Sequence, residues 1–137
     1  PLVARFVSIL MSEGKKTVAE RLIYGALENL QERIHEEPPI RVFSKAIENV
    51  RPRLELKPWR VGVSTYQIPV EVAVPRGNSL AMRWIMDFAR KKKGKSIEVK
   101  LAEELLAAYK LEGPAIKKRD ETHKMAEANK AFAHLRW

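Results

Sequence analysis

Hydrophobic residues in the first fifty positions recur every three or four residues, which is the period of a helix with one buried face. This pattern predicts three helices. The first covers residues 2–12, the second ends before the prolines at 38–39, and the third is closed by Pro52. Proline fixes φ and lacks the backbone N–H that a continuing helix needs, so these prolines mark helix ends.

The period of the pattern changes to two in the middle of the chain, which indicates strands. Charged and apolar residues alternate in RLELK, and apolar residues stand two apart in IPVEVAV. We expect two antiparallel strands, over residues 54–60 and 66–73, joined by a turn. Pro58 and Pro69 cannot donate ladder hydrogen bonds, which suits a two-stranded ribbon with free edges. Because such a ribbon is marginal alone, helices should support its base while its tip projects.

Helical periodicity returns after the ribbon. It predicts three further helices, over residues 79–92, 97–110 and 115–134. Ser96 is placed to cap the second of them, because its hydroxyl can accept a hydrogen bond from the first turn. Gly113 followed by a proline separates this helix from the last one.

These elements predict a mainly α fold: a six-helix, bundle-like domain with a protruding two-stranded β-ribbon between helices three and four. A length of 137 residues is usual for one domain, and a hydrophobic content of 45% can supply a core. We therefore expect residues 1–137 to form a single domain with its ribbon at about 54–73. No apolar run approaches the roughly 18 residues needed to cross a bilayer, so we expect no membrane partner.

The charge of the chain indicates what kind of partner the fold binds. The formal net charge is +9, from 26 Lys and Arg against 17 Asp and Glu. Residues 20–55 carry a net charge of −1, whereas residues 56–137 carry +8. Solubility does not require such a concentration of cations, but a surface that binds a polyanion does.

Candidate catalytic and metal-binding groups are sparse. The chain has no cysteine, and its histidines, His35, His123 and His134, lack the spacing of metal ligands. Glu103 and Glu104 are adjacent on a predicted helix, where neighbouring side chains do not face each other, so we expect both on solvated surface. The sequence predicts a protein that is not an enzyme and needs no cofactor or metal.

Basic residues gather in four places that we predict to contact phosphates. One run links the fourth and fifth helices, and a second lies at the start of the last helix. A third group lies on the ribbon and the residues leading into it, and a fourth lies between the first two helices. The predicted contacts are Lys15, Lys16, Arg60, Arg76, Arg90, Lys91, Lys92, Lys93, Lys95, Lys117, Lys118 and Arg119. Four more join them through their position on or beside the ribbon: Arg53, Lys57, Trp59 and Arg83.

Other interpretations of these residues stay open. The run that starts at Arg90 also suits a solvated loop whose cations complement a helix C-terminus. Arg83 is spaced to pair with Asp87 on one helix face. Trp59 is open to stacking on an unpaired base, whereas Tyr66 is expected to cover the base of the ribbon.

Four segments resemble small-subunit ribosomal protein seven of the bacterial type. Residues 61–72, VGVSTYQIPVEV, are similar to the ribbon motif of that family. GKK at 14–16 followed by AE at 19–20, and LAMRW at 80–84, resemble two of its helical segments. Residues 117–134, KKRDETHKMAEANKAFAH, are close to its C-terminal signature.

The resemblance implies six helices with a β-ribbon between the third and fourth. It also implies a primary binder of 16S ribosomal RNA that nucleates assembly of the head of the small subunit. Such a protein sits near the exit site, with its ribbon close to tRNA and mRNA, and contacts small-subunit proteins nine and eleven. Some members repress translation of their own messenger. The implied location is the ribosome of the bacterial cytoplasm or of an organelle.

The sequence departs from the family pattern in several places. Lys57-Pro58-Trp59 stands where family ribbons carry more arginine, and Val63 stands where they have glycine. Leu135 replaces an aromatic residue before the final Arg-Trp. Family members usually begin with a basic arm, whereas this chain starts at Pro1, so we expect that an arm has been trimmed or left out.

Two other function classes compete with this interpretation. A DNA-binding helical module would insert one recognition helix into a major groove. A membrane-surface protein would set a basic face against an exposed apolar face. The cations here are spread over several loops and a ribbon, which favours folded RNA over the DNA-binding module. Co-sedimentation with liposomes would test the membrane-surface class.

Overall fold

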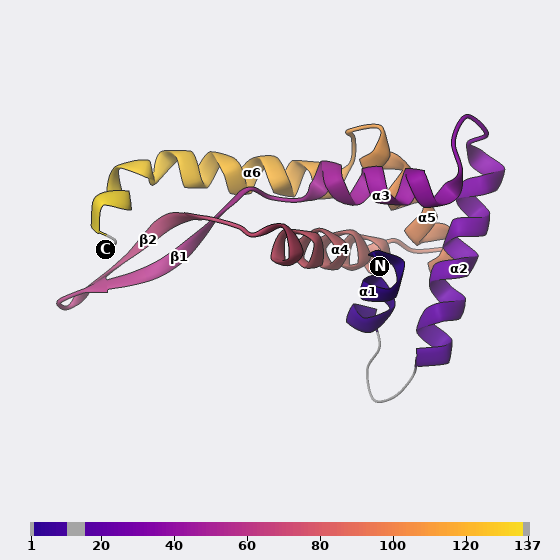
Figure 1. The fold of residues 1–137 in the computed structure, drawn as a ribbon, viewed down its shortest axis with the longest axis horizontal. Coiled ribbons are helices and arrows are strands. Elements are labelled where there is room, and N and C mark those ends of the chain that lie inside the picture. The colour runs from indigo at the N-terminus through magenta and orange to yellow at the C-terminus, as the bar shows by residue number, and fades with distance from the viewer. Residues whose placement is uncertain (1, 11–15, 136–137) are drawn as a thin grey trace.

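The structure is a computed structural model that describes residues 2–10 and 16–135 (Figure 1). Within these residues it contains six α-helices, a two-stranded antiparallel ribbon between the third and fourth helices, and a short 3₁₀ helix, which confirms the predicted fold class. The elements are α1 (Leu2–Leu10), α2 (Lys16–Arg33), α3 (Pro39–Val50), β1 (Leu54–Val61), β2 (Ser64–Glu71), α4 (Val74–Lys91), α5 (Ile97–Tyr109), α6 (Pro114–Ala128) and the 3₁₀ helix η1 (Lys130–Leu135).

The helices form a body from which the ribbon extends. Figure 1 shows α3, α4 and α6 running along the long axis of the molecule, while α2 crosses one end. The ribbon projects from the other end, and η1 lies beside it. Helix α5 packs against α2, α3 and α4, so it is the central helix of the body.

The core is one continuous cluster of buried side chains contributed by all six helices. Phe6 and Phe43, with ring centroids 5.6 Å apart, join α1 to α3. Leu101 and Leu105 of α5 are fully buried, and each contributes roughly 1.5–3 kcal/mol of stability through this burial. The loops and the ribbon that carry the predicted contacts are therefore attached to a well-packed support.

The ribbon matches the prediction in place and orientation, although its strands reach closer to the tip. β1 extends to Val61 and β2 starts at Ser64, so only Gly62 and Val63 form the turn. Gly62 has a φ of +62°, a conformation that glycine adopts without steric cost and that two-residue hairpin turns require.

Helix α4 begins at Val74 rather than at residue 79. Pro75 falls in the first turn, where its missing N–H would have no partner in any case. Gly77 is buried where α4 meets the end of α3, and a Cβ there would lie 2.6 Å from Cγ of Arg51. The proline and glycine therefore start a helix and allow close packing, whereas the sequence pattern had placed them in a loop.

The end of the chain also differs from the prediction, which had one helix over residues 115–134. Helix α6 ends at Ala128, and Asn129 leads into η1. The predicted N-cap of α5 is confirmed, because the hydroxyl of Ser96 accepts a hydrogen bond from the backbone N–H of Val99 at 3.5 Å.

The C-terminal elements cover one side of the ribbon. Ile68 of β2 is only 1% exposed. The Tyr66 ring lies 5.3 Å from the ring of Phe132, and Asn129 Nδ2 donates a hydrogen bond to the carbonyl of Gln67 at 2.9 Å. The expected support of the ribbon by helical elements is confirmed. Tyr66 was expected to cover the base of the ribbon, but its pair with Trp59 is the third from the turn, so it packs with Phe132 in the half of the ribbon nearer the turn.

Candidate nucleic-acid interface

The last turn of α4 and the linker to α5, together termed the α4–α5 loop, contain the densest group of cations. Arg90, Lys91 and Lys93 are exposed, and they have no carboxylate partner among the described residues. The Nζ of Lys91 lies 5.2 Å from the centre of the Phe88 ring, which holds the side chain close to the helix surface. These cations also complement the C-terminal dipole of α4, so their own helix favours their charge.

Two other cations of the same loop are paired with α5. Lys95 Nζ lies 2.6 Å from Glu103 Oε2, and Lys92 Nζ lies 3.4 Å from Glu103 Oε1 and 3.1 Å from Glu104 Oε1. Burial alone would lower the pKa of Lys92, but its hydrogen bonds to the two carboxylates raise it. The structure therefore uses Lys92 and Lys95 to fasten the loop.

The prediction that Glu103 and Glu104 lie on solvated surface is wrong. Glu104 is 2% exposed, and its Oε2 has no hydrogen-bond partner among the described groups. The hydrogen bond from Lys95 lowers the pKa of Glu103. Because α5 is surrounded by other helices, even the sides of this helix that carry acidic residues are partly covered, and lysines from the preceding loop compensate the charges.

Of the three predicted contacts at the start of α6, two are exposed cations and one is bonded within the fold. Lys117 and Lys118 are exposed, and the Nζ of Lys118 lies 5.5 Å from the centre of the Trp84 ring. Arg119 donates hydrogen bonds to the carbonyl of Asn49, at the end of α3, and to Oδ1 of Asp120. Lys117 and Lys118 thus remain accessible to a phosphate, while Arg119 joins two helices.

The two cations of the ribbon lie on opposite sides, because Lys57 shares the side of the aromatic residues while Arg60 occupies the other. Trp59 pairs in register with Tyr66, so both face the side covered by η1, and Trp59 is 38% exposed. Arg60 pairs with Thr65 on the opposite side. Lys57 is also exposed. Arg60 therefore has the freer position for a phosphate, and Trp59 is a partly covered candidate for base stacking.

The two arginines at the base of the ribbon have different surroundings. Arg76 donates two hydrogen bonds to Glu55, with Nε and a terminal nitrogen 2.7 and 2.8 Å from the carboxylate oxygens. These bonds lower the pKa of Glu55 and raise that of Arg76, so the charge of Arg76 is largely neutralised. Arg53 is exposed, and its backbone N–H donates to Nε2 of His123 at 2.9 Å.

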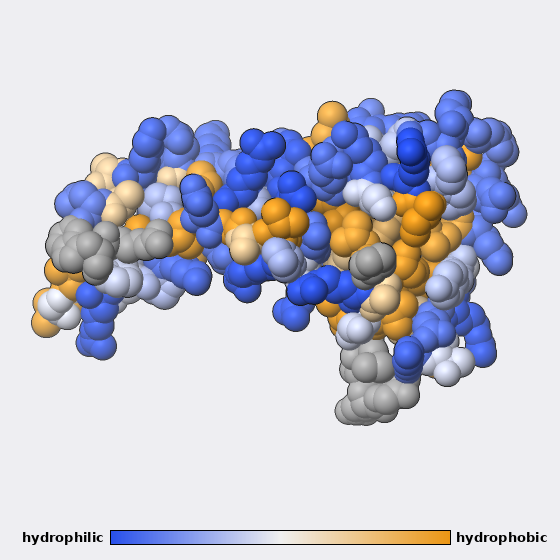
Figure 2. Space-filling model, in the orientation of Figure 1, coloured by the Kyte–Doolittle hydropathy of each residue, from blue (hydrophilic) through white to orange (hydrophobic). Residues whose placement is uncertain are grey.

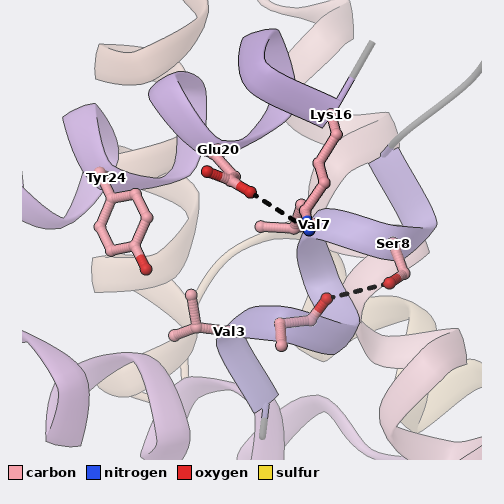
Figure 3. A pocket seen from close by; sticks show the side chains of 7 residues that line it. Val3, Val7, Ser8, Lys16, Glu20 and Tyr24 are labelled. Carbon is pink, nitrogen blue, oxygen red and sulfur yellow. Dashed lines mark hydrogen bonds and ion pairs between the residues drawn. The ribbon is translucent and has the colours of Figure 1, made fainter. Parts of the chain in front are cut away.

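The N-terminal elements hold the remaining predicted contacts. Lys15 lies outside the described residues. Lys16 is exposed and stands 3.8 Å from Glu20, an i,i+4 pair that lies in the groove between α1 and α2 (Figure 3). Arg83 of α4 is exposed, and the structure shows no ion pair between it and Asp87.

Sequence reasoning missed Arg5. Its Nε donates a hydrogen bond to Oγ of Ser79 at 3.0 Å, and its side chain lines a groove between α1 and α4 together with Arg83. The available signal was a single charged residue on the polar side of an apolar helical stretch. Nothing in the local pattern shows that this side faces another arginine.

Hydrophilic side chains dominate the visible surface over α6, α3 and the ribbon, and an apolar area shows beside α1 (Figure 2). Within the described residues there is no group of three acidic, histidine or cysteine side chains placed to hold a metal ion. No helix among them combines the length and the apolar character needed to cross a membrane. The surface chemistry is that of a polyanion-binding protein on a helical scaffold.

The chain belongs to the family described as Ribosomal protein S7p/S5e, whose profile matches residues 1–130. Small ribosomal subunit protein uS7 of Pseudothermotoga lettingae is 57% identical over 136 residues, which cover 99% of this chain and 87% of the relative. The uS7 proteins of Thermotoga maritima and Nitrosococcus oceani are 53% and 55% identical, and the alignments cover 99% and 98% of this chain and 87% and 86% of those relatives.

Membership in this family confirms the resemblance found in the sequence. It gives the chain a structural role in the small ribosomal subunit and places it in a family of non-enzymes. The chain is accordingly a ribosomal component, and its exposed cations can be interpreted as a surface for ribosomal RNA.

Proposed function

We propose that this chain binds 16S ribosomal RNA as a primary binder and thereby nucleates assembly of the head of the small subunit. The observation that carries the proposal is the α4–α5 loop. Arg90, Lys91 and Lys93 are exposed without carboxylate partners among the described residues, while Lys92 and Lys95 fasten the loop to α5. Neighbouring cations repel each other, and RNA phosphates relieve this repulsion while counterions are released.

The exposed cations of other elements extend this surface. Lys117 and Lys118 come from α6, Lys118 lies against Trp84 of α4, and Arg60 comes from the ribbon. Contacts spread over a loop, a helix and a ribbon suit a folded RNA with phosphates in several directions. The rigid core keeps these groups in fixed relative positions, so shape fit adds to the gain from charge neutralisation.

The ribbon suits a position near the exit site, close to tRNA and the mRNA path. Its tip extends beyond the helical body (Figure 1), and Val63 in the turn is 98% exposed. Arg60 stands two residues before the turn, on the side away from η1. The tip can thus approach an RNA strand that does not touch the helices.

A protein neighbour is also part of the proposal. Glu28, Glu32 and Glu36 are exposed along the end of α2 and beyond it. Carboxylates there disfavour RNA and suit basic protein segments, so this end is our candidate surface for small-subunit proteins nine and eleven. The similarity to bacterial relatives supports a cytoplasmic bacterial ribosome, and an organellar ribosome is compatible with the same chemistry.

A competition assay tests the RNA assignment. The chain is bound to a labelled RNA fragment from the head of the small subunit, and unlabelled duplex DNA of equal length competes. We expect the DNA to displace the RNA only at a large excess, because its phosphates lack the folded arrangement. Equal competition by DNA would favour a DNA-binding helical module and would contradict the proposed function.

A further inference from the structure

A groove of about 480 Å³ between α1 and α4 is lined by two arginines and two serines. It is lined by Ala4, Arg5, Ser8, Ile9, Ser79 and Arg83. None of these residues carries a carboxylate. By contrast, four other grooves of the described structure are each lined by at least one glutamate.

The two arginines reach the groove from opposite walls because of helical periodicity. Ser79 and Arg83 are four residues apart on α4, and Arg5 and Ser8 are three apart on α1, so each pair shares one helix face. The structure shows no ion pair between either arginine and a described acidic residue. Two guanidinium groups thus face one groove without a compensating negative charge.

A hydrogen-bond chain fixes one of the two arginines. The hydroxyl of Ser79 donates to the carbonyl of Pro75 at 3.1 Å and accepts from Nε of Arg5 at 3.0 Å. Arg5 spends one of its five N–H donors in this way. Its terminal nitrogens, which have no hydrogen-bond partner among the described groups, stay available to bind an oxyanion in the fork geometry that arginine provides.

We propose that Arg5, Ser8, Ser79 and Arg83 form a phosphate clamp that holds a backbone phosphodiester of the bound RNA. The clamp rests on the proposed RNA-binding function and adds a site that the basic runs in the sequence do not indicate. Arg5 and Arg83 neutralise the phosphate. Ser79 positions Arg5. The Ser8 hydroxyl donates to the carbonyl of Ala4 at 3.1 Å in the free chain and can rotate to donate its proton to a phosphate oxygen at the rim instead.

The groove between α1 and α2 provides a contrast on the other side of the same helix. It has a similar volume of about 480 Å³, but Val3, Val7 and Tyr24 line it, and Glu20 pairs there with Lys16 (Figure 3). A phosphate placed in that groove would meet a carboxylate and apolar side chains. Of the two grooves beside α1, only the one facing α4 has the chemistry of an anion site.

The test compares the double variant Arg5→Ala/Arg83→Ala with Arg41→Ala/Lys45→Ala. The control removes two exposed cations from α3, where the adjoining groove contains Glu37 and Glu48. Affinity for the RNA fragment from the subunit head is measured at several salt concentrations. The slope of log affinity against log salt is negative, and we expect the clamp variant to reduce its magnitude by about 1.4–1.8, which corresponds to two lost phosphate contacts. The control should leave the slope unchanged.

A third variant, Arg5→Lys/Arg83→Lys, separates the clamp from a loss of folding. It keeps both charges, so we expect a salt slope close to the wild-type value and an affinity that falls because lysine lacks the fork. If all three variants bind like the wild type, the clamp is wrong while the proposed function stands. An equal change of the salt slope in the α3 control would also overturn the clamp. Failure of the wild-type chain to prefer the RNA would overturn both proposals.

Discussion

His123 stabilises the fold as a neutral hydrogen-bond acceptor rather than as a cation. Its Nε2 accepts the hydrogen bond from the Arg53 backbone N–H, which requires that nitrogen to be unprotonated. Burial lowers the pKa of His123, the charges of Arg119 and Arg53 lower it further, and Asp120 opposes them. Glu48 and Arg51 of the α3 end line the same pocket. The neutral ring therefore ties α6 to the start of the ribbon.

This bond predicts a pH-dependent stability. Below the ordinary histidine pKa of 6.5, the unfolded chain binds a proton at His123 before the folded chain does. The free energy of unfolding should therefore fall as pH is lowered from about 6.5, until the lowered folded-state pKa is passed. Urea unfolding at a series of pH values, with the wild type and His123→Gln, measures the effect as the difference between the two curves.

The exposed His35 supplies the control for this measurement. His35→Gln should leave the pH dependence of the wild type unchanged. Parallel stability curves for the wild type and His123→Gln would show that the ring nitrogen makes no contribution, and the account of His123 would then be wrong.

Lys92 and Lys95 differ in what their removal leaves behind. Lys92→Ala strands the carboxylate of Glu104, which is buried, and should cost about 1–3 kcal/mol of stability. Lys95→Ala leaves Glu103 partly exposed and still next to Lys92, so its effect should stay within about 0.5 kcal/mol. Chemical denaturation of both variants provides the comparison. Equal losses would mean that burial of Glu104 does not decide the energetics of this loop.

The ribbon and the C-terminal segment depend on each other as elements. A two-stranded ribbon has little stability by itself, and here Ile68, Tyr66 and Gln67 are covered or bonded by α6 and η1. The register also decides which ribbon side is free, because the side that carries Arg60 points away from η1. The C-terminal segment therefore stabilises the ribbon and leaves free the side that carries Arg60.

Phe132→Ala should loosen the ribbon without unfolding the helical core. The substitution removes an aromatic pair worth about 0.5–1.5 kcal/mol, so amides of β1 and β2 should exchange faster with solvent while those of α5 keep their protection. Hydrogen exchange measured by NMR or mass spectrometry resolves the two regions. Val63→Ala, at the exposed turn, serves as the control. Unchanged exchange in the ribbon of Phe132→Ala would rule out the proposed support.

At the scale of the whole molecule, local patterns predicted the elements, and long-range contacts decided the chemistry. The helices and the ribbon were predicted from hydrophobic periods of 3.6 and 2 residues, and such a period can be detected within a short stretch of sequence. The pairing of Arg76 with Glu55, and of Arg119 with the Asn49 carbonyl, joins residues far apart in the chain. No local pattern distinguishes a cation that meets a carboxylate from one that meets solvent.

The same reason explains the two largest differences between prediction and structure. Glu104 looked like a surface residue because its neighbours along the chain include charged groups, yet α5 is enclosed by other helices. Arg5 looked like an isolated charge in an apolar helix, yet the fold places it opposite Arg83. The basic runs identified the class of partner, and the tertiary structure identified which cations are available to it.

The central claim is that the free cations of the α4–α5 loop bind RNA phosphates while Lys92 holds the loop in place. The most direct test measures binding of the triple variant Arg90→Ala/Lys91→Ala/Lys93→Ala to the RNA fragment from the subunit head across a range of salt concentrations. We predict a weaker affinity and a log–log salt slope whose magnitude is smaller by about 2–3, from the loss of three phosphate contacts. Affinity and slope equal to the wild type would contradict the account.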